Sequence, residues 1–325
     1  MDSKSSKSVT ANNDPLERAN INLNLGETHF RLAEYKKAIT YYIKYQEICT
    51  EIGNFQGLAT ACEKLGSACL NLGQPEEAIE YFATSLEIFI QFDNHSGVAT
   101  NNGNLGTAYH SLGEHDKAID YFKKGLEISA AIGDKSGMAN INGKLGSVYL
   151  SLGEYKKAID YLKNGLEMNI AIGDKSGMAD NNGNLGSVYF RLGEYVKSVS
   201  YLRQGLELST AIGDKPATVN GDVGNVYLMF GEYEKAIDYF KKSLEMRTVI
   251  GHKSGIETNY GDLGYAYLRL GDYEKAIDYF KNSLEIQTAI GHKSGIETNY
   301  GHLGNAYFRL GEYEKAISYY RKVWE

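Results

Sequence analysis

The dipeptide Leu-Gly returns along this chain at a fixed interval, and that interval constrains the fold more than any other feature. It occurs at 25–26 and then every forty residues as far as 185–186. The next copy, Val223-Gly224, comes thirty-eight residues later, and 263–264 and 303–304 restore the spacing of forty. A constant period of this length is typical of stacked helical repeats. The 325 residues therefore form eight repeats, and the chain is long for one compact core but not for an elongated stack.

Residues 176–213 show how one repeat folds. Leu185, Tyr189 and Leu192 are spaced as one face of a helix, and Gly193 ends that helix because glycine accepts the left-handed conformation without strain. A second apolar face follows and ends at Gly213 in the same way. Each repeat is therefore expected to be two antiparallel helices of about 17 residues, each roughly 25 Å long. Neither helix can bury its apolar face alone, so the hairpins must stack.

The repeats divide the chain almost completely. Asp14 is a good N-cap, Pro15 suits the first helical turn, and Glu17 completes a capping-box pattern. Residues 1–13 are polar, without the apolar core of a signal peptide, and are expected to be a disordered tail. The expected repeats span 14–53, 54–93, 94–133, 134–173, 174–213, 214–251, 252–291 and 292–325, the last of them incomplete.

These motifs resemble the tetratricopeptide repeat. Leu185-Gly186, Tyr189, Gly193 and Tyr195 match its pattern, and the preceding repeat has the small residue Ala158 at the expected place. The period of forty resembles a subtype found in Pins/LGN-type G-protein-signalling scaffolds and in bacterial arrays beside peptidase-like domains. The resemblance implies an all-α, right-handed superhelical solenoid of about eight hairpins. It also implies protein binding in a concave groove lined by the first helices.

Some positions depart from the repeat pattern. Ala33 stands where the other repeats have a turn glycine, and Pro216 replaces Ser-Gly in a linker two residues short, so a changed joint is expected there. The position that holds the first Lys of the family's chaperone-tail clamp is Gly or Glu63, which argues against that ligand. No GoLoco sequence is visible, so the resemblance does not extend to G-protein regulation.

Catalysis and metal binding have little support in the sequence. The seven histidines are scattered, and His110 and His115 lack a third ligand. The Gly-Asp-Lys-Ser-Gly linkers follow a helix and lack the spacing of a phosphate loop. We therefore expect a protein without enzymatic activity, cofactor or metal.

The three cysteines favour a reducing compartment. Cys62 and Cys69 are seven residues apart on one expected helix, roughly 10 Å along its axis, which is too far for a disulfide. With Cys49 they are expected to be reduced, partly buried thiols of a cytoplasmic protein.

The charge and the aromatic pattern argue against nucleic acid. The net charge of −7 disfavours binding to nucleic acid or to anionic membrane, and no apolar run is long enough to insert into a bilayer. Most of the twenty-six tyrosines recur at two fixed positions, such as Tyr109 and Tyr121, which indicates packing inside the stack rather than base stacking.

The resemblance implies which residues line the groove. They lie two residues and one residue before the Leu, and two, five and six residues after it in each repeat. Amides and hydroxyls at these positions can bind a peptide backbone, and arginines can bind its carboxylates, although polar residues there could also be an ordinary solvated surface. The predicted peptide-binding residues are Asn104, Thr107, Lys144, Ser147, Asn184, Ser187, Arg191, Asn225, Asp262, Arg269, Asn305 and Arg309.

A glycine recurs two residues before the Leu in repeats three to eight, as at Gly103 and Gly183. Close packing of neighbouring helices is the favoured reason, and a flat strip for a partner's backbone is the alternative. The last helix is short, so Leu303, Tyr307, Ile317 and Trp324 are expected to leave apolar surface exposed. Such a surface would be covered by further chain or by a second copy.

The leading hypothesis is a scaffold or adaptor that binds an extended partner peptide, in intracellular signalling or cell polarity. The first alternative is a regulatory or sensor region of a larger enzyme or signalling protein. The second is a self-assembly module that associates through its C-terminal repeat.

Overall fold

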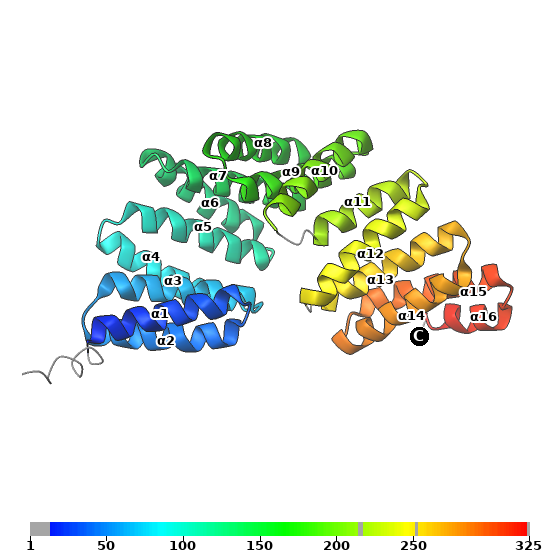
Figure 1. Cartoon of the computed structure of the whole chain (residues 1–325), viewed down its shortest axis with the longest axis horizontal. Coiled ribbons are helices and arrows are strands. Elements are labelled where there is room, and N and C mark those ends of the chain that lie inside the picture. Colours follow the sequence, from blue (N-terminus) through cyan, green and yellow to red (C-terminus); the bar gives the residue numbers. More distant parts are fainter. Residues whose placement is uncertain (1–13, 214–216, 251–252, 324–325) are drawn as a thin grey trace, which may run out of the picture. The chain divides into compact units, whose positions relative to one another are not determined.

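The computed structural model describes residues 14–213, 217–250 and 253–323. The described residues form sixteen helices in successive hairpin pairs, so the predicted all-α class and its repeated hairpins are confirmed. They belong to two compact units, 1–172 and 173–325, each of which is a stack of four hairpins (Figure 1). The predicted tail, the joint at Pro216, His252 and Trp324 lie outside the described residues.

Unit 1 contains four hairpins, each made of two helices of nearly equal length. Its helices are α1 (Pro15–Arg31), α2 (Tyr35–Glu51), α3 (Phe55–Asn71), α4 (Pro75–Gln91), α5 (His95–Ser111), α6 (His115–Ala131), α7 (Lys135–Ser151) and α8 (Tyr155–Ile172).

Unit 2 repeats this arrangement with a shorter last helix. Its helices are α9 (Lys175–Arg191), α10 (Tyr195–Ala211), α11 (Ala217–Met229), α12 (Tyr233–Ile250), α13 (Lys253–Leu270), α14 (Tyr273–Ile290), α15 (Lys293–Leu310) and α16 (Tyr313–Arg321).

The recurring Leu-Gly pair lies at the centre of its hairpin in every repeat except the first, where Leu25 is 38% exposed. Leu105, Leu145 and Leu185 are at most 1% exposed. A methyl group added to the glycine that follows would lie within 3 Å of the facing second helix: it would meet the Phe122 ring at Gly106 and the Leu162 side chain at Gly146. The glycine is therefore required because the side chain of the second helix occupies the space of its missing Cβ.

The turns between paired helices use a left-handed residue. Gly113, Gly153 and Gly193 have φ values of 73–76°, and Ala33 adopts the same conformation with φ 57°. In the first hairpin the backbone N–H of Glu34 donates to the carbonyl of His29 at 2.9 Å, which closes the helix end.

Each described N-cap of a first helix in unit 1 uses an Asp or Asn side chain. The Asp14 carboxylate accepts a hydrogen bond from the N–H of Leu16 at 2.9 Å, with Pro15 in the first turn, as predicted. Asn54, Asn94 and Asp134 accept in the same way from the glycine three residues later.

The periodic tyrosines stack within hairpins, which confirms the packing interpretation. Tyr109 and Tyr121 have ring centroids 5.3 Å apart and nearly parallel planes, and Tyr149 and Tyr161 repeat the arrangement at 5.4 Å. The same pair recurs in every later hairpin.

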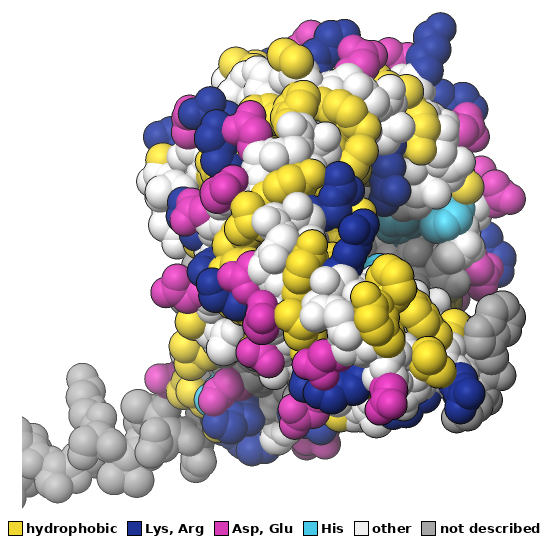
Figure 2. Space-filling model, turned by 90° about the vertical axis from the view of Figure 1, so that its right-hand side faces the viewer, with side chains coloured by type: hydrophobic (Ala, Val, Ile, Leu, Met, Phe, Trp, Pro, Cys, Tyr) yellow, Lys and Arg dark blue, Asp and Glu magenta, His cyan; other side chains and the backbone are white. Residues whose placement is uncertain are grey.

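The prediction for the C-terminal end is only partly correct. Ile317 is 51% exposed, but Leu303 and Tyr307 are buried because they face the core that α15 shares with α14 and α16. Phe308 and Tyr313 are exposed instead. Figure 2 looks onto this end of unit 2 and shows hydrophobic side chains interspersed with charged ones.

Candidate functional site

Unit 1 has a cavity of about 410 Å³ that runs along the seam between α5 and α7. Its walls are spaced as one face of each helix: Thr100, Asn104 and Thr107 on α5, and Asn140 and Lys144 on α7. Further lining residues come from α1, α3, α4 and α6. The volume lies within the range of about 300–1,000 Å³ that is usual for ligand-binding pockets.

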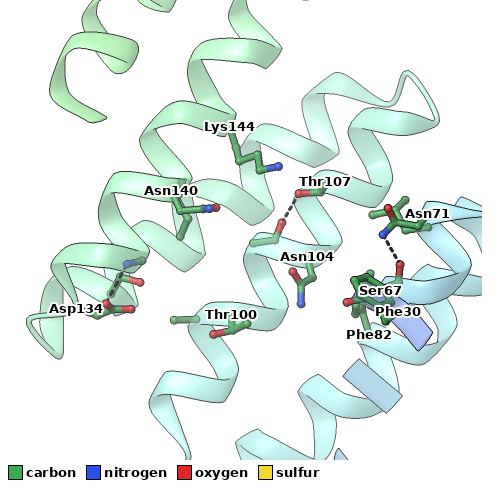
Figure 3. Close-up of a pocket in the computed structure, with 16 residues that line it drawn as sticks. Phe30, Ser67, Asn71, Phe82, Thr100, Asn104, Thr107, Asp134, Asn140 and Lys144 are labelled. Carbon is green, nitrogen blue, oxygen red and sulfur yellow. Dashed lines mark hydrogen bonds between the residues drawn. The ribbon is translucent and has the colours of Figure 1, made fainter. Parts of the chain in front are cut away.

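Three of the predicted groove residues line this cavity. Asn104 and Thr107 are half-buried and Lys144 is exposed. Figure 3 shows Lys144 extending from α7 toward Thr107 at one end of the cavity. The Thr107 hydroxyl donates to the carbonyl of Gly103 at 3.0 Å, so its lone pairs face outward as acceptors.

Two lysines at the same repeat position in unit 1 differ in whether an ion pair within the protein already holds them. Lys64 on α3, two repeats before Lys144, is ion-paired with Glu27 at 2.7 Å. Lys144 occupies the same repeat position on α7, and no ion pair holds it among the described residues. Burial, His115 and Lys144 together lower the pKa of the neighbouring His110, so at neutral pH Lys144 is the cation that can bind a ligand carboxylate there.

The opposite end of the cavity reaches deeper into the stack. Asp134 and Thr100 lie there (Figure 3). The lining also includes Ser129 of α6, which is 1% exposed and whose hydroxyl has no hydrogen-bond partner. A buried hydroxyl without a partner costs free energy, about 1–3 kcal/mol, and such groups are uncommon.

Ser129 was not among the predicted residues, because all of these lie on first helices and Ser129 lies on a second helix. A comparison of the repeats at this second-helix position would have drawn attention to it. The equivalent residues are Cys49, Phe89, Asn169, Ser209, Arg247 and Gln287. Phe89 fills its place against Gly97, where an added methyl group would meet the ring at 2.5 Å, whereas serine at 129 leaves space.

The remaining predicted residue of unit 1, Ser147, donates to the carbonyl of Gly143 at 3.2 Å and lies one turn beyond Lys144. Eight predicted residues lie on the first helices of unit 2. Asn184, Ser187, Asn225 and Asp262 are half-buried, and Arg191, Arg269, Asn305 and Arg309 are exposed.

Several of these unit 2 residues already bind one another or their neighbours. The Ser187 hydroxyl donates to the Asp222 carboxylate at 3.0 Å, and the Tyr320 hydroxyl donates to Asn305 at 2.8 Å. Arg269 donates to the hydroxyls of Tyr233 at 2.9 Å and Tyr265 at 3.3 Å, and it lies over both rings. The guanidinium predicted to bind a ligand carboxylate therefore has partners within the protein.

The groove face of unit 2 carries two half-buried aspartates, Asp222 and Asp262. Burial raises the pKa of Asp262 to about 7; Arg247 opposes the rise, and Asp222 and Glu257 add to it. Burial likewise raises the pKa of Asp222, opposed by its hydrogen bond from Ser187. Arg247 reaches this region from α12 and donates to the carbonyl of Gly255 and to Asn259.

The packing explanation of the glycine stripe is wrong. A methyl group on Gly183 would meet only Val219, at 3.5 Å, and one on Gly301 would meet nothing within 4 Å. At Gly103 the nearest atom would be 3.8 Å away. The helices do not approach closely enough at this position to require glycine, since the tight contacts are made by the glycine of the Leu-Gly pair.

The groove residues of both units offer hydrogen bonds and charges to a ligand. Among the described residues no three His, Cys, Asp or Glu side chains converge as metal ligands. The three cysteines are buried, unpaired thiols, and burial together with Glu77 raises the pKa of Cys69 to about 11, which makes it a poor nucleophile at neutral pH. In the described part of the chain no helix is long and apolar enough to cross a membrane.

Comparison with known families defines the class of this protein. The tetratricopeptide-repeat model matches residues 17–91, 57–131, 97–171, 137–211, 176–248 and 255–324. The chain belongs to the tetratricopeptide-repeat family, as the sequence motifs predicted. A search of curated proteins by sequence found no match.

Solved structures share the fold at low sequence identity. A signal-transduction ATPase of the STAND class with a tetratricopeptide-repeat sensor, from Pyrococcus horikoshii, is 19% identical with a TM-score of 0.68; the match covers 95% of this chain and 53% of that one. This chain thus spans about half the length of that protein.

Two peptide complexes also match. A Rap protein with competence and sporulation factor is 16% identical with a TM-score of 0.68, covering 87% of this chain and 79% of that one. The Rap conjugation regulator of plasmid pLS20 with the Phr* peptide is 17% identical with a TM-score of 0.68, covering 98% and 82%.

Proposed function

We propose that this protein is a non-catalytic scaffold that binds an extended peptide segment of a partner along its first helices. The observation that carries the proposal is the cavity between α5 and α7, where polar side chains alternate with the apolar Phe30, Phe82 and Ile141. Exposed amides and hydroxyls beside an unpaired lysine suit a peptide backbone and a carboxylate.

The printed descriptions of the two Rap complexes support this proposal. Both name a bound peptide or factor, and both structures share the fold of this chain. Within the proposal the protein acts in intracellular signalling in the cytoplasm, where buried thiols stay reduced. Cell polarity, a process in which scaffolds of the resembling subtype act, is one setting for it.

A site-specific cross-linking experiment tests the proposal. A photoreactive residue is placed at exposed Thr100 in the cavity wall or at exposed Lys123 on α6, and partners from a lysate are cross-linked. We expect cross-links from position 100 only, and at least tenfold fewer of them when Lys144→Glu is added. Equal cross-linking from position 123, or no effect of Lys144→Glu, would place recognition elsewhere.

A second candidate function is a sensor region within a longer protein. It is favoured by the match to the STAND ATPase, whose description assigns the repeats a sensor role and of which this chain covers 53%. Reading the gene beyond the codon for Glu325 tests it, since a catalytic domain in the same frame would support the sensor and a stop codon would oppose it.

Self-association through the C-terminal repeat is a third proposal. Phe308, Tyr313 and Ile317 are each more than half exposed on the end of unit 2 shown in Figure 2. Sedimentation at increasing concentration tests it: the dimer fraction should fall with Ile317→Lys, and a monomer at all concentrations would contradict it.

A further inference from the structure

The cavity of unit 1 has chemically different ends. Asp134 caps the start of α7 and Lys144 lies ten residues later, roughly 15 Å farther along the helix axis, and both line the cavity. Asp134 and Thr100 lie at one end, and Lys144 and Thr107 lie at the other (Figure 3). The buried Ser129 belongs to the first end, because its hydroxyl and the Asp134 carboxylate both lie against Gly137. A ligand that fills the seam therefore meets an acidic, hydroxyl-rich end and a basic end.

The Ser129 end is open because of the residue at that position. In the preceding repeat Phe89 fills the equivalent place, and in a later one the amide of Gln287 does so while bonded to Glu257 and Asn299. Ser129 is too small to fill it, and its hydroxyl lies beside Gly137 without a hydrogen-bond partner. One Asp134 oxygen accepts from the N–H of Gly137 at 2.9 Å, which leaves the other with capacity to accept.

We propose that this end of the cavity is a subsite for a hydrogen-bond-donating side chain of the bound peptide, such as lysine, arginine or glutamine. The donor binds the Ser129 hydroxyl and the Asp134 carboxylate while an acidic residue of the same peptide binds Lys144. An extended chain advances about 3.3 Å per residue, so the two recognised residues are about three to five positions apart. The inference rests on the proposed function and names the partner's chemistry.

Four variants of the full chain separate the two ends. Lys144→Glu reverses the charge at the basic end, and Ser129→Leu fills the subsite. Ser129→Ala removes only the hydroxyl, and Asp134→Ser removes the charge but keeps an N-cap side chain for α7. Ser85→Ala is the matched control, because Ser85 is equally buried on α4 but donates to the carbonyl of Ala59 and does not line the cavity.

The probe is a displayed library of random heptapeptides, selected on the wild-type chain and on each variant. We expect the wild type to enrich an acidic residue three to five positions from Lys, Arg, Asn or Gln. Lys144→Glu should lose the acidic preference, and Ser129→Leu should lose the donor preference while keeping the acidic one. For one selected peptide, calorimetry should show affinity at least fivefold weaker on Ser129→Leu and twofold or more weaker on Ser129→Ala.

Stability measurements distinguish a variant that loses peptide binding from one that fails to fold. Ser129→Ala should raise the melting temperature by about 2 °C while it weakens peptide binding, because the unpartnered hydroxyl is gone. Ser85→Ala should lower the melting temperature and leave peptide affinity unchanged. Loss of affinity in proportion to loss of stability across all variants would overturn the subsite.

The remaining outcomes distinguish the subsite from the groove. If Ser129→Leu selects the same peptides as the wild type while Lys144→Glu does not, the subsite is wrong and the groove stands. If neither variant changes the selection, or if the wild type enriches nothing over the Lys144→Glu/Ser129→Leu double variant, both the subsite and peptide binding in this cavity are overturned.

Discussion

The left-handed backbone conformation at one residue of each turn decides which residue types the turn tolerates. Ala33 and Asp93 have φ values of 57° and 53°, whereas the corresponding positions elsewhere are glycines such as Gly73 at 76°. A Cβ in the left-handed region is strained, by roughly 1–2 kcal/mol, so these two turns are weak points in the first two repeats.

Replacing Ala33 with glycine should stabilise the protein. We expect a gain of about 0.5–1 kcal/mol, because the relieved strain exceeds the added freedom of glycine in the unfolded chain. Gly73→Ala is the control, since nothing lies within 4 Å of its missing Cβ and only backbone strain changes. It should destabilise by about 1 kcal/mol in urea unfolding. A change of the same sign in the two variants would show that the turn conformation is not the cause.

Two glycines on α9 should respond in opposite ways to the same substitution. Gly186→Ala places a methyl group 2.5 Å from Leu202 and should cost roughly 1–3 kcal/mol. Gly183→Ala meets only Val219 at 3.5 Å and should stabilise by up to about 1 kcal/mol through helix propensity. Thermal unfolding of both variants checks the pair, and a loss of stability with Gly183→Ala would restore the packing explanation.

At the scale of helices, the repeats differ in the polar groups that they bury between neighbouring hairpins. Helix α13 carries Asp262 on its groove side and Glu257 near its start, and Glu257 accepts from Gln287 at 2.7 Å and contacts His292 at 3.2 Å. Glu257 is only 3% exposed. The raised pKa of the buried Asp262 carboxyl gives unit 2 a dependence on pH that hydrophobic packing alone would not produce.

Asp262 should make the protein less stable as the pH rises. Its pKa is about 7 in the folded state and about 3.8 in the unfolded chain, so between these values only the unfolded chain releases the proton. This contribution is fully favourable below about pH 4 and is lost as the pH rises to 7.

The variant Asp262→Asn tests this pH dependence. It should be more stable than the wild type at pH 8, by roughly 1–3 kcal/mol, and nearly equal to it at pH 4. Exposed Asp278 provides the control, because Asp278→Asn should change stability by less than about 0.5 kcal/mol at either pH. An equal effect of the two variants at pH 8 would rule out burial of Asp262 as the cause.

At the scale of the whole molecule, stability is distributed hairpin by hairpin. Each hairpin packs mainly on its sequence neighbours, so a hairpin at the end of a stack lacks one interface. Helix α16 buries only Ala316, whereas α14 buries Ala276, Ile277 and Phe280 among others.

Native-state hydrogen exchange should reveal this gradient. We expect amides of α16 to exchange fastest among the described helices of unit 2 and those of α13 and α14 to exchange most slowly. Uniform protection across α13 to α16 would mean that unit 2 opens as a single cooperative block.

The class of fold and the two-helix plan of the repeat could both be predicted from the amino-acid pattern alone. The period of forty, the Leu-Gly pair and the turn glycines are local, repeated signals, and each hairpin forms mainly from contacts within itself and with its sequence neighbours. The position within the repeat also predicted that Asn104, Thr107 and Lys144 lie on the same face of their helices, the face that lines the cavity.

The residues that fill the space between hairpins could not be predicted and became clear only from the packing of the helices. It showed that the Leu-Gly glycine, not the stripe at Gly183, is in close contact, and that Arg269 is bound by two tyrosines. It also revealed the cavity that reaches Ser129. The periodicity of the sequence predicts the direction in which a side chain points. A cavity depends on the combined volumes of several side chains from different helices, and the residue type at one repeat position does not reveal that sum.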